Sequence, residues 1–150
     1  MRRSRAGFTL VEVLIVVVIM AVLAALVIPQ FTSSTDDAKA STLLANLRTL
    51  RAQLELYRFH HDGAVPTITA ASLPQLTSAT NVAGSMGAAG TSFPFGPYLV
   101  TGIPENPVNG KNTVVEATTV PPAAVSGDAG WLYDTETGRI WANTTEFLAK

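Results

Sequence analysis

The architecture of this chain follows from one stretch near its amino terminus, Phe8-Thr9-Leu10-Val11-Glu12, and the apolar run directly after it, VLIVVVIMAVLAALVI at residues 13–28. As an α-helix, residues 8–28 would extend about 31 Å, at roughly 1.5 Å per residue. That length matches a bilayer hydrocarbon core of about 30 Å. Aliphatic side chains and alanine would surround the helix on every side, which excludes an amphipathic helix lying on a membrane surface. The sequence therefore predicts a membrane-spanning helix here.

The rest of the chain has the composition of an ordinary water-exposed domain. Of 150 residues, 47% are hydrophobic and 14% charged, and the formal net charge is −1. The length suits one domain, the hydrophobic content excludes a disordered chain, and the balanced charge predicts no nucleic-acid binding. The sequence contains no cysteine, which excludes disulfides, thiolate metal sites and a cysteine nucleophile. No acid–base, nucleophile or metal constellation is found, so we expect no enzyme.

The residues before the apolar run predict both an orientation and a cleavage point. Residues 1–7 contain three arginines and no acid, a pattern that retains this end in the cytoplasm and sends the rest across the membrane. A secretory signal would carry its small-residue cleavage site after the apolar stretch. Here Gly7 stands before it. Cleavage after Gly7 would remove only the basic leader and leave the membrane helix on the mature chain.

Glu12 is an acid inside the predicted span. A carboxylate at the centre of a membrane helix costs roughly 2.5–3.5 kcal/mol or more, and less near an end. One interpretation is that Glu12 lies near the interface, or is protonated, and has no function. The other is that it meets a cation. Cleavage after Gly7 would give Phe8 a free amine, and a second copy shifted by about one helical turn would bring that amine to Glu12, so that the two charges neutralise each other.

The hexapeptide Gly7-Phe8-Thr9-Leu10-Val11-Glu12, after a basic leader and before an aliphatic helix closed by Pro29, resembles the processing signature of type IV pilins and type II secretion pseudopilins. The resemblance covers about the first 30 residues. It implies that a prepilin peptidase cuts between Gly7 and Phe8 and N-methylates Phe8. It also implies that Glu12 serves methylation and subunit docking in a filament.

The same resemblance implies an α+β, pilin-like fold. One long helix, half in the membrane and half soluble, would pack on a small antiparallel β-sheet. In the residues themselves, an apolar stripe with helical spacing predicts a helix face that packs on a core rather than a coiled-coil seam; its members are Leu43, Leu47, Leu50, Leu54 and Tyr57. Pro29 would bend this long helix or loosen it locally. We interpret His60-His61-Asp62 as solvated polar residues, not metal ligands.

The carboxy-terminal half predicts turns and short strands. A short helix is expected near residues 72–76, a mobile loop over 81–96 and a strand over 113–118. A hairpin is expected from residues 131–134 and 139–143, whose aromatic side chains should pack in the core. The stretch from Pro97 to Gly110 resembles the loop that leads to the sheet in the major pseudopilin of type II secretion.

These observations predict five segments: a basic leader peptide at 1–7, a transmembrane and filament-core helix at 8–29, the soluble half of the long helix at 30–63, a variable loop region with a short helix at 64–112, and an antiparallel β-sheet region at 113–150. Many major pseudopilins bind calcium through an acidic loop. The only acids near the corresponding loop are Asp128, Asp134 and Glu136, so calcium is an open but unsupported alternative and no cofactor is predicted.

The predicted function is a structural subunit of a type II secretion pseudopilus. The chain would lie in a bacterial inner membrane as a single-pass protein with a periplasmic domain, and then enter a helical filament of its own copies. The implied partners are other pseudopilins, the prepilin peptidase, the inner-membrane assembly platform and the membrane itself. Two alternatives stay open: a type IV pilus or DNA-uptake subunit, and an anchored extracytoplasmic binding domain that does not assemble.

Overall fold

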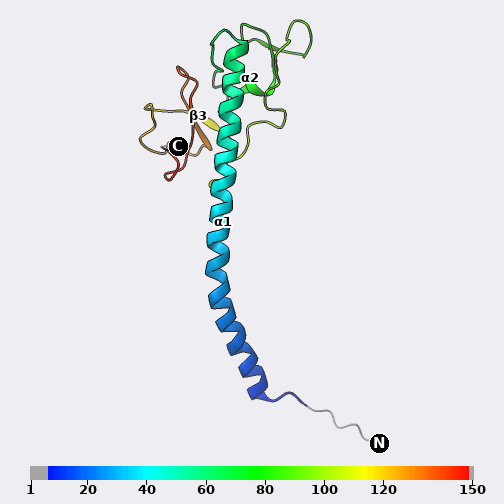
Figure 1. Ribbon diagram of the computed structural model, residues 1–150, viewed down its shortest axis with the longest axis vertical. Coiled ribbons are helices and arrows are strands. Elements are labelled where there is room, and N and C mark those ends of the chain that lie inside the picture. The colour runs from blue at the N-terminus through cyan, green and yellow to red at the C-terminus, as the bar shows by residue number, and fades with distance from the viewer. Residues whose placement is uncertain (1–6, 149–150) are drawn as a thin grey trace, which may run out of the picture. The chain divides into compact units, whose positions relative to one another are not determined.

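The computed structural model describes residues 7–148, with the side chains of residues 29–33 excepted. The chain divides into two compact units, Met1–Ala38 and Lys39–Lys150. A single helix, α1 (Leu10–His60), supplies the regular structure among the described residues of the first unit and enters the second (Figure 1). Pro29 does not interrupt α1, which continues as one helix on both sides of this proline.

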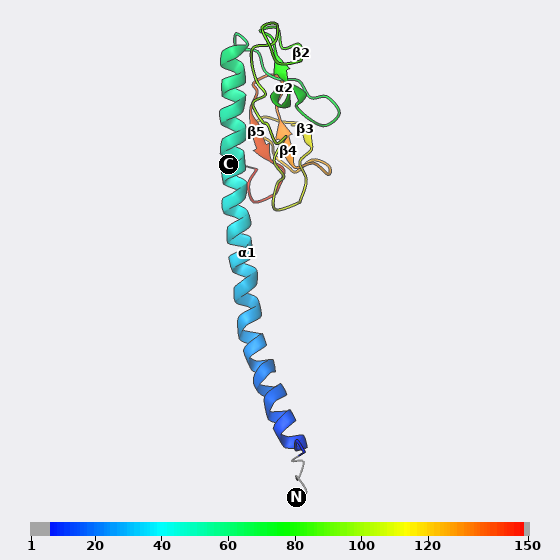
Figure 2. The same cartoon turned by 90° about the vertical axis from the view of Figure 1, so that its right-hand side faces the viewer.

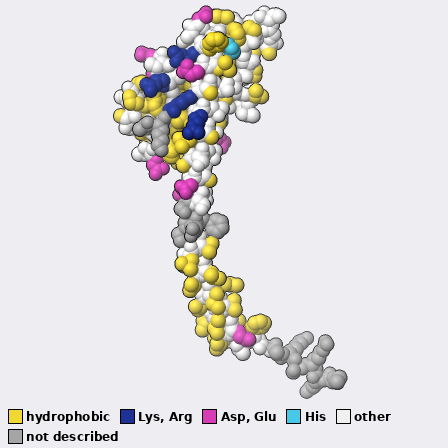
Figure 3. All heavy atoms as spheres, in the orientation of Figure 1, with side chains coloured by type: hydrophobic (Ala, Val, Ile, Leu, Met, Phe, Trp, Pro, Cys, Tyr) yellow, Lys and Arg dark blue, Asp and Glu magenta, His cyan; other side chains and the backbone are white. Residues whose placement is uncertain are grey.

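The first unit presents apolar side chains to its surroundings. Residues Leu10–Ile28 have a mean hydropathy of 3.2 and are not buried against any other described part of the chain. This segment is long enough and apolar enough to cross a membrane. On the face seen in Figure 3, hydrophobic side chains cover this part of α1 almost completely. Such a surface is unfavourable in water, so lipid or other apolar helices must cover it.

The second unit has a core built on one face of α1. The predicted stripe is confirmed, since all five of its side chains are at most 2% exposed. They pack with Leu73, Leu76, Val114 and Ile140 and with the aromatic rings of Trp131 and Tyr133. Both buried rings satisfy their polar atoms: Trp131 Nε1 donates to Pro104 O at 2.8 Å, and Tyr133 Oη donates to Pro66 O at 2.9 Å. The aromatic side chains thus belong to the core, as the sequence predicted.

A three-stranded sheet lies against this face of α1 (Figure 2). Its strands are β3 (Val114–Glu116), β4 (Trp131–Tyr133) and β5 (Ile140–Ala142), in the order β3-β4-β5. The predicted hairpin is confirmed, because β4 and β5 pair antiparallel. However, β3 pairs parallel with β4, so the sheet is mixed rather than wholly antiparallel. Parallel neighbours need a crossover, and residues 117–130 supply it.

The α+β class is confirmed, and the region between α1 and β3 holds more structure than the predicted loop. The short helix α2 (Pro74–Thr77) begins with proline at its first turn. Strands β1 (Ala79–Thr80) and β2 (Met86–Gly87) form a two-stranded antiparallel sheet. β2 therefore lies inside the stretch for which only a loop was expected.

The interpretation of His60-His61-Asp62 as solvated residues is wrong for His61. Its side chain is 2% exposed and stacks on the ring of Tyr57, with centroids 3.7 Å apart. Its Nδ1 lies 2.7 Å from Tyr57 O and its Nε2 lies 3.0 Å from Thr80 Oγ1. The segment around Thr80 folds over the end of α1 and encloses this histidine. Such burial depends on residues distant in sequence, which the local polar pattern does not reveal.

Candidate functional site

The start of α1 is a reciprocal hydrogen-bonded cap made by Thr9 and Glu12. The backbone N–H of Thr9 donates to Glu12 Oε2 at 2.8 Å, and the Thr9 hydroxyl donates to the same oxygen at 2.8 Å. In return, the backbone N–H of Glu12 donates to Thr9 Oγ1 at 3.2 Å. This is a capping box, in which Thr9 is the N-cap and Glu12 the third helical residue. It satisfies backbone donors that a helix start otherwise leaves open.

This cap was not predicted above, although Thr9-Leu10-Val11-Glu12 has the T-x-x-E pattern of a capping box. In the uncut chain the carboxylate of Glu12 already accepts hydrogen bonds from within its own helix turn, so a cation from another copy is not its only possible partner. All the Glu12 side-chain bonds found among the described residues go to Oε2.

Gly7 and Phe8 lie immediately before the helix. Neither is helical, and α1 begins two residues after Phe8. The space around Gly7 is open, since a Cβ built there would meet no atom within 4 Å, and Phe8 is 86% exposed. The peptide bond between them thus lies outside regular secondary structure, and both of its residues are exposed. The three predicted site residues therefore lie within six consecutive positions at the helix start.

The acids that could have bound calcium are already engaged or face solvent. Asp128 forms a salt bridge with Lys111, in which Asp128 Oδ2 lies 3.0 Å from Lys111 Nζ. Asp134 accepts the backbone N–H of Glu136 at 3.1 Å and that of Thr137 at 3.2 Å. The Thr137 hydroxyl also donates to Asp134, and this bond is the main cause that holds the pKa of Asp134 below its ordinary value. Within residues 7–148, no group of three acids or histidines converges on a metal position.

Side-chain amides hold the loop that leads into β4. Asn143 Nδ2 donates to Ser126 O at 2.9 Å and to Ala129 O at 2.8 Å, and Asn143 Oδ1 accepts the N–H of Ser126 at 2.9 Å. Asn109 Nδ2 donates to the same Ala129 carbonyl at 3.0 Å. Two side-chain N–H donors therefore share the Ala129 carbonyl oxygen. These hydrogen bonds close the loop.

Comparison with known proteins identifies the class of the amino-terminal segment. Residues 2–28 match the family model described as the prokaryotic N-terminal methylation motif. The match covers Gly7, Phe8 and Glu12, and it confirms the pilin-like resemblance noted in the sequence.

The more specific similarity is to type II secretion system core protein G. The Pseudomonas aeruginosa protein of that name is 44% identical over 57 residues, which is 38% of this chain and 40% of the relative. The Escherichia coli K12 protein is 32% identical over 88 residues, or 54% of this chain and 61% of the relative. A ComG operon protein 3 homolog of Bacillus licheniformis is 30% identical over 63 residues, 42% of this chain and 65% of the relative.

These alignments are partial. The chain matches about two fifths of the length of the Pseudomonas relative and about three fifths of the Escherichia relative. No solved structure shows significant similarity to the chain. The pseudopilin-like resemblance thus rests on the motif and on these partial alignments. The fold of the second unit is described from the structure of this chain alone.

Proposed function

We propose that this chain is a structural subunit of a type II secretion pseudopilus and carries out no catalysis. The observation that carries this proposal is an exposed Gly7–Phe8 bond placed directly before an apolar helix in a segment similar to core protein G of that system. We favour secretion over a pilus or DNA-uptake role because the relatives of higher identity are named type II secretion system core protein G.

The apolar helix explains both a membrane form and a filament form. Residues Leu10–Ile28 expose aliphatic side chains on all sides. Before assembly, the lipid of an inner membrane would cover them, with the arginine-rich leader in the cytoplasm and the second unit in the periplasm. In the filament, the same helices of other copies, together with those of other pseudopilins, would replace the lipid. An assembly platform in the inner membrane would move each subunit from the first environment to the second.

Processing would prepare the helix start for assembly. A prepilin peptidase would cut between Gly7 and Phe8 and methylate the new amine of Phe8. The cap of Thr9 uses Glu12 Oε2, which leaves Oε1 as an acceptor for a cation. We propose that the amine of Phe8 from a neighbouring copy binds there. Two charges that are each costly in an apolar environment would then neutralise each other.

Mass spectrometry of the chain extracted from membranes tests the processing step. The expected mass corresponds to a chain that starts at N-methylated Phe8. An intact Met1 in cells that contain the peptidase would instead support the anchored, non-assembling alternative and refute this proposal.

Glu12→Gln tests the docking step. The variant keeps an acceptor oxygen for the cap but removes the negative charge. We therefore expect the assembled fraction to fall by about tenfold or more, which corresponds to a loss of roughly 1.4 kcal/mol of binding free energy per docking contact. The matched control is Glu55→Gln, which removes an exposed acid of the same helix that lies in the second unit. Equal assembly of the wild type and Glu12→Gln, measured by electron microscopy of sheared filaments, would refute the docking step.

A further inference from the structure

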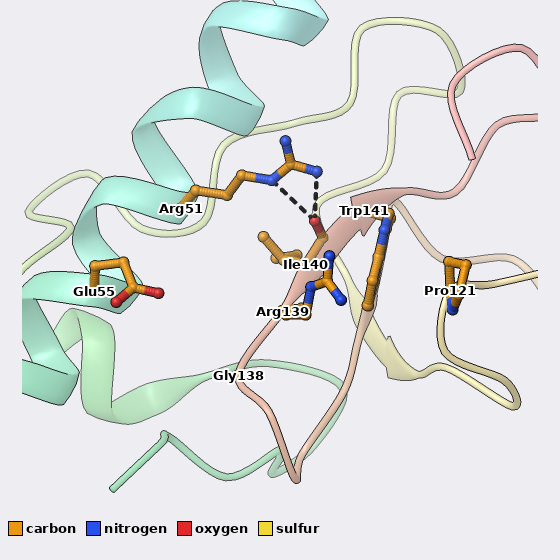
Figure 4. A pocket seen from close by; sticks show the side chains of 7 residues that line it. All are labelled: Arg51, Glu55, Pro121, Gly138, Arg139, Ile140 and Trp141. Carbon is orange, nitrogen blue, oxygen red and sulfur yellow. Dashed lines mark hydrogen bonds between the residues drawn. The ribbon is translucent and has the colours of Figure 1, made fainter. Parts of the chain in front are cut away.

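Two cavities of the second unit differ in chemical character. The larger, about 610 Å³ between α1 and β5, is lined by charged side chains, among them Arg51 and Arg139 (Figure 4). Both arginines have partners within the fold. Arg51 Nη2 donates to Ile140 O at 3.1 Å, and the guanidinium carbon of Arg139 lies 5.5 Å from the centroid of the Trp141 ring. Contacts within one copy therefore account for this cavity.

The smaller cavity is a groove of about 560 Å³ in which none of the described lining residues is charged. Its walls come from Ala70 and Ala71, from the segment around Val100, and from Asn112 and Thr113 just before β3. Hydroxyl and amide groups supply its polar atoms, and the apolar side chain of Val100 is 85% exposed. The groove therefore suits an uncharged segment of polypeptide, which offers backbone hydrogen-bonding groups together with apolar side chains.

The turn that forms one wall of the groove has a backbone conformation that alanine rarely adopts. Ala70 and Ala71 have φ angles of 50° and 54°, in the left-handed region. Two backbone hydrogen bonds between Thr69 and Ser72, of 2.9 and 3.0 Å, close this turn, and Ala71 O accepts the N–H of Val114 at 2.8 Å. The wall is thus attached to the first strand of the sheet. Strained backbone of this kind is concentrated at functional sites.

The groove belongs to a surface without charge. Residues 64–104 contain no Asp, Glu, Lys, Arg or His. On the face seen in Figure 3, Lys and Arg side chains gather on α1 and to its left, and no described one is seen on the loops to its right. The segment is nevertheless ordered, because the N–H groups of Tyr98 and Leu99 both donate to Leu76 O at 2.8 Å. Its exposed apolar side chains include Val82, Met86 and Val100. Depletion of charged residues is typical of the centre of a protein interface.

A second surface without charge lies on the crossover between β3 and β4. Residues 117–127 contain no charged residue, and most of them are exposed, including Val120 and Val125. In the view of Figure 1 this loop lies to the left of α1, whereas α2 and most of residues 64–104 lie to its right. Pro121 of the loop lines the cavity between α1 and β5 (Figure 4), so the described loop does not fill the groove of its own copy.

We propose that the groove binds residues 117–127 of a second copy of this chain, an inference that rests on the proposed assembly into a filament. A filament needs two unlike faces on each copy, because a contact between unlike faces can repeat without closing. The groove and the crossover loop are two such faces of one compact unit. An uncharged groove also disfavours charged segments, since a buried charge would lose its hydration without gaining a counter-ion.

The proposed contact gives each part of the loop a partner. Val120 and Val125 would bring apolar side chains to Val100, and the loop backbone would form hydrogen bonds with the hydroxyl and amide groups of the groove. This contact would be a docking site separate from the helix start.

Paired cysteines test the proposal, because the chain has no cysteine of its own. Val100 and Val125 are 85% and 46% exposed, so Val100→Cys and Val125→Cys should leave the fold unchanged. Filaments of the full chain, produced with its assembly machinery, are treated with a short bismaleimide. The double variant should give a ladder of covalent multimers, because each copy would be linked to the next on both sides. Each single variant should give no covalent product.

The matched control pairs Val125→Cys with Val108→Cys, a valine that is 45% exposed and lies outside the described lining of the groove. An equal ladder from this control pair would refute the groove as the site of contact. Covalent dimers from Val100→Cys alone would show that like faces meet, and would refute the crossover loop as the occupant.

Val100→Glu tests whether assembly depends on the groove. The substitution would bury an unpaired carboxylate in the contact, so we expect the assembled fraction to fall by at least about tenfold. Val108→Glu should assemble normally. The melting temperature and the cleavage before Phe8 should be unchanged in both variants, because both valines are exposed. Loss of assembly in Val100→Glu without multimers from the double cysteine variant would refute the loop of a second copy as the occupant.

The remaining outcomes separate this inference from the proposed function. If the wild type forms no filament, the proposed function fails, and this inference fails with it. If the wild type forms filaments, the double cysteine variant gives no multimers and Val100→Glu assembles as well as Val108→Glu, the groove is not a docking site, while the proposed function stands.

Discussion

Replacement of Asn143 by alanine measures how the loop before β4 is held. The variant removes three hydrogen bonds, two to the carbonyls of Ser126 and Ala129 and one from the N–H of Ser126. A net contribution of about 0.5–1.5 kcal/mol per bond gives about 3 kcal/mol. Because Asn109 still donates to Ala129 O in the variant, we expect a loss of about 2–3 kcal/mol. This corresponds to a fall in melting temperature of roughly 10 °C.

The assay is unfolding of the full chain in detergent micelles, followed by tryptophan fluorescence, with and without excess EDTA. The melting temperature of the wild type should not respond to EDTA, because within residues 7–148 no group of three acids or histidines lies where it could hold a metal ion. Asn81→Ala is the matched control, since it removes a single bond, to Ser85 N at 2.9 Å, and should cost about 1 kcal/mol or less. A shift below about 2 °C for Asn143→Ala, or destabilisation of the wild type by EDTA, would refute the reasoning.

Three further predictions concern the second unit. Gly130→Ala should cost about 1–3 kcal/mol or more, because a Cβ there would overlap a backbone carbonyl oxygen, whereas Gly90→Ala meets open space and should leave the urea midpoint unchanged. Leu50→Ala should cost about 3 kcal/mol, since the side chain is fully buried, while Leu56→Ala, at 42% exposure, should cost well under about 1 kcal/mol; denaturant unfolding compares the two. The lowered pKa of Asp134 means that its contribution to stability is complete above about pH 5 and decreases as the pH falls through its folded-state pKa. Acid unfolding of Asp134→Asn should lack that decrease.

Local sequence patterns predicted the elements that depend on near neighbours in the chain. The apolar run, the helical stripe and the hairpin each repeat with the period of their own secondary structure, so they could be recognised without tertiary information. All five members of the stripe are buried. The cap at the helix start was also readable from Thr9 and Glu12, although its meaning was missed, because the same two residues also fit a processing signature.

The mistakes all involve contacts between distant segments. His61 has polar neighbours in sequence, yet a residue nineteen positions later covers it. The parallel pairing of β3 depends on how the crossover loop returns, and strand-like composition carries no information about that direction. The hydrogen bonds that hold the loop before β4 come from Asn143 and Asn109, which approach it from other parts of the chain.

The linear order of residues by itself determined the membrane-type helix and the face of α1 that packs on a core, and it predicts a cleavable basic leader, because these properties arise from hydrophobicity and charge at fixed local spacing. Only the tertiary structure determined the mixed sheet, the amide-closed loop and the cavity that brings Arg51 beside Arg139. Each of these features requires two segments that are distant in sequence to come into contact. The free energy that favours one arrangement of such segments over other arrangements is spread over many buried contacts, and no short motif contains it.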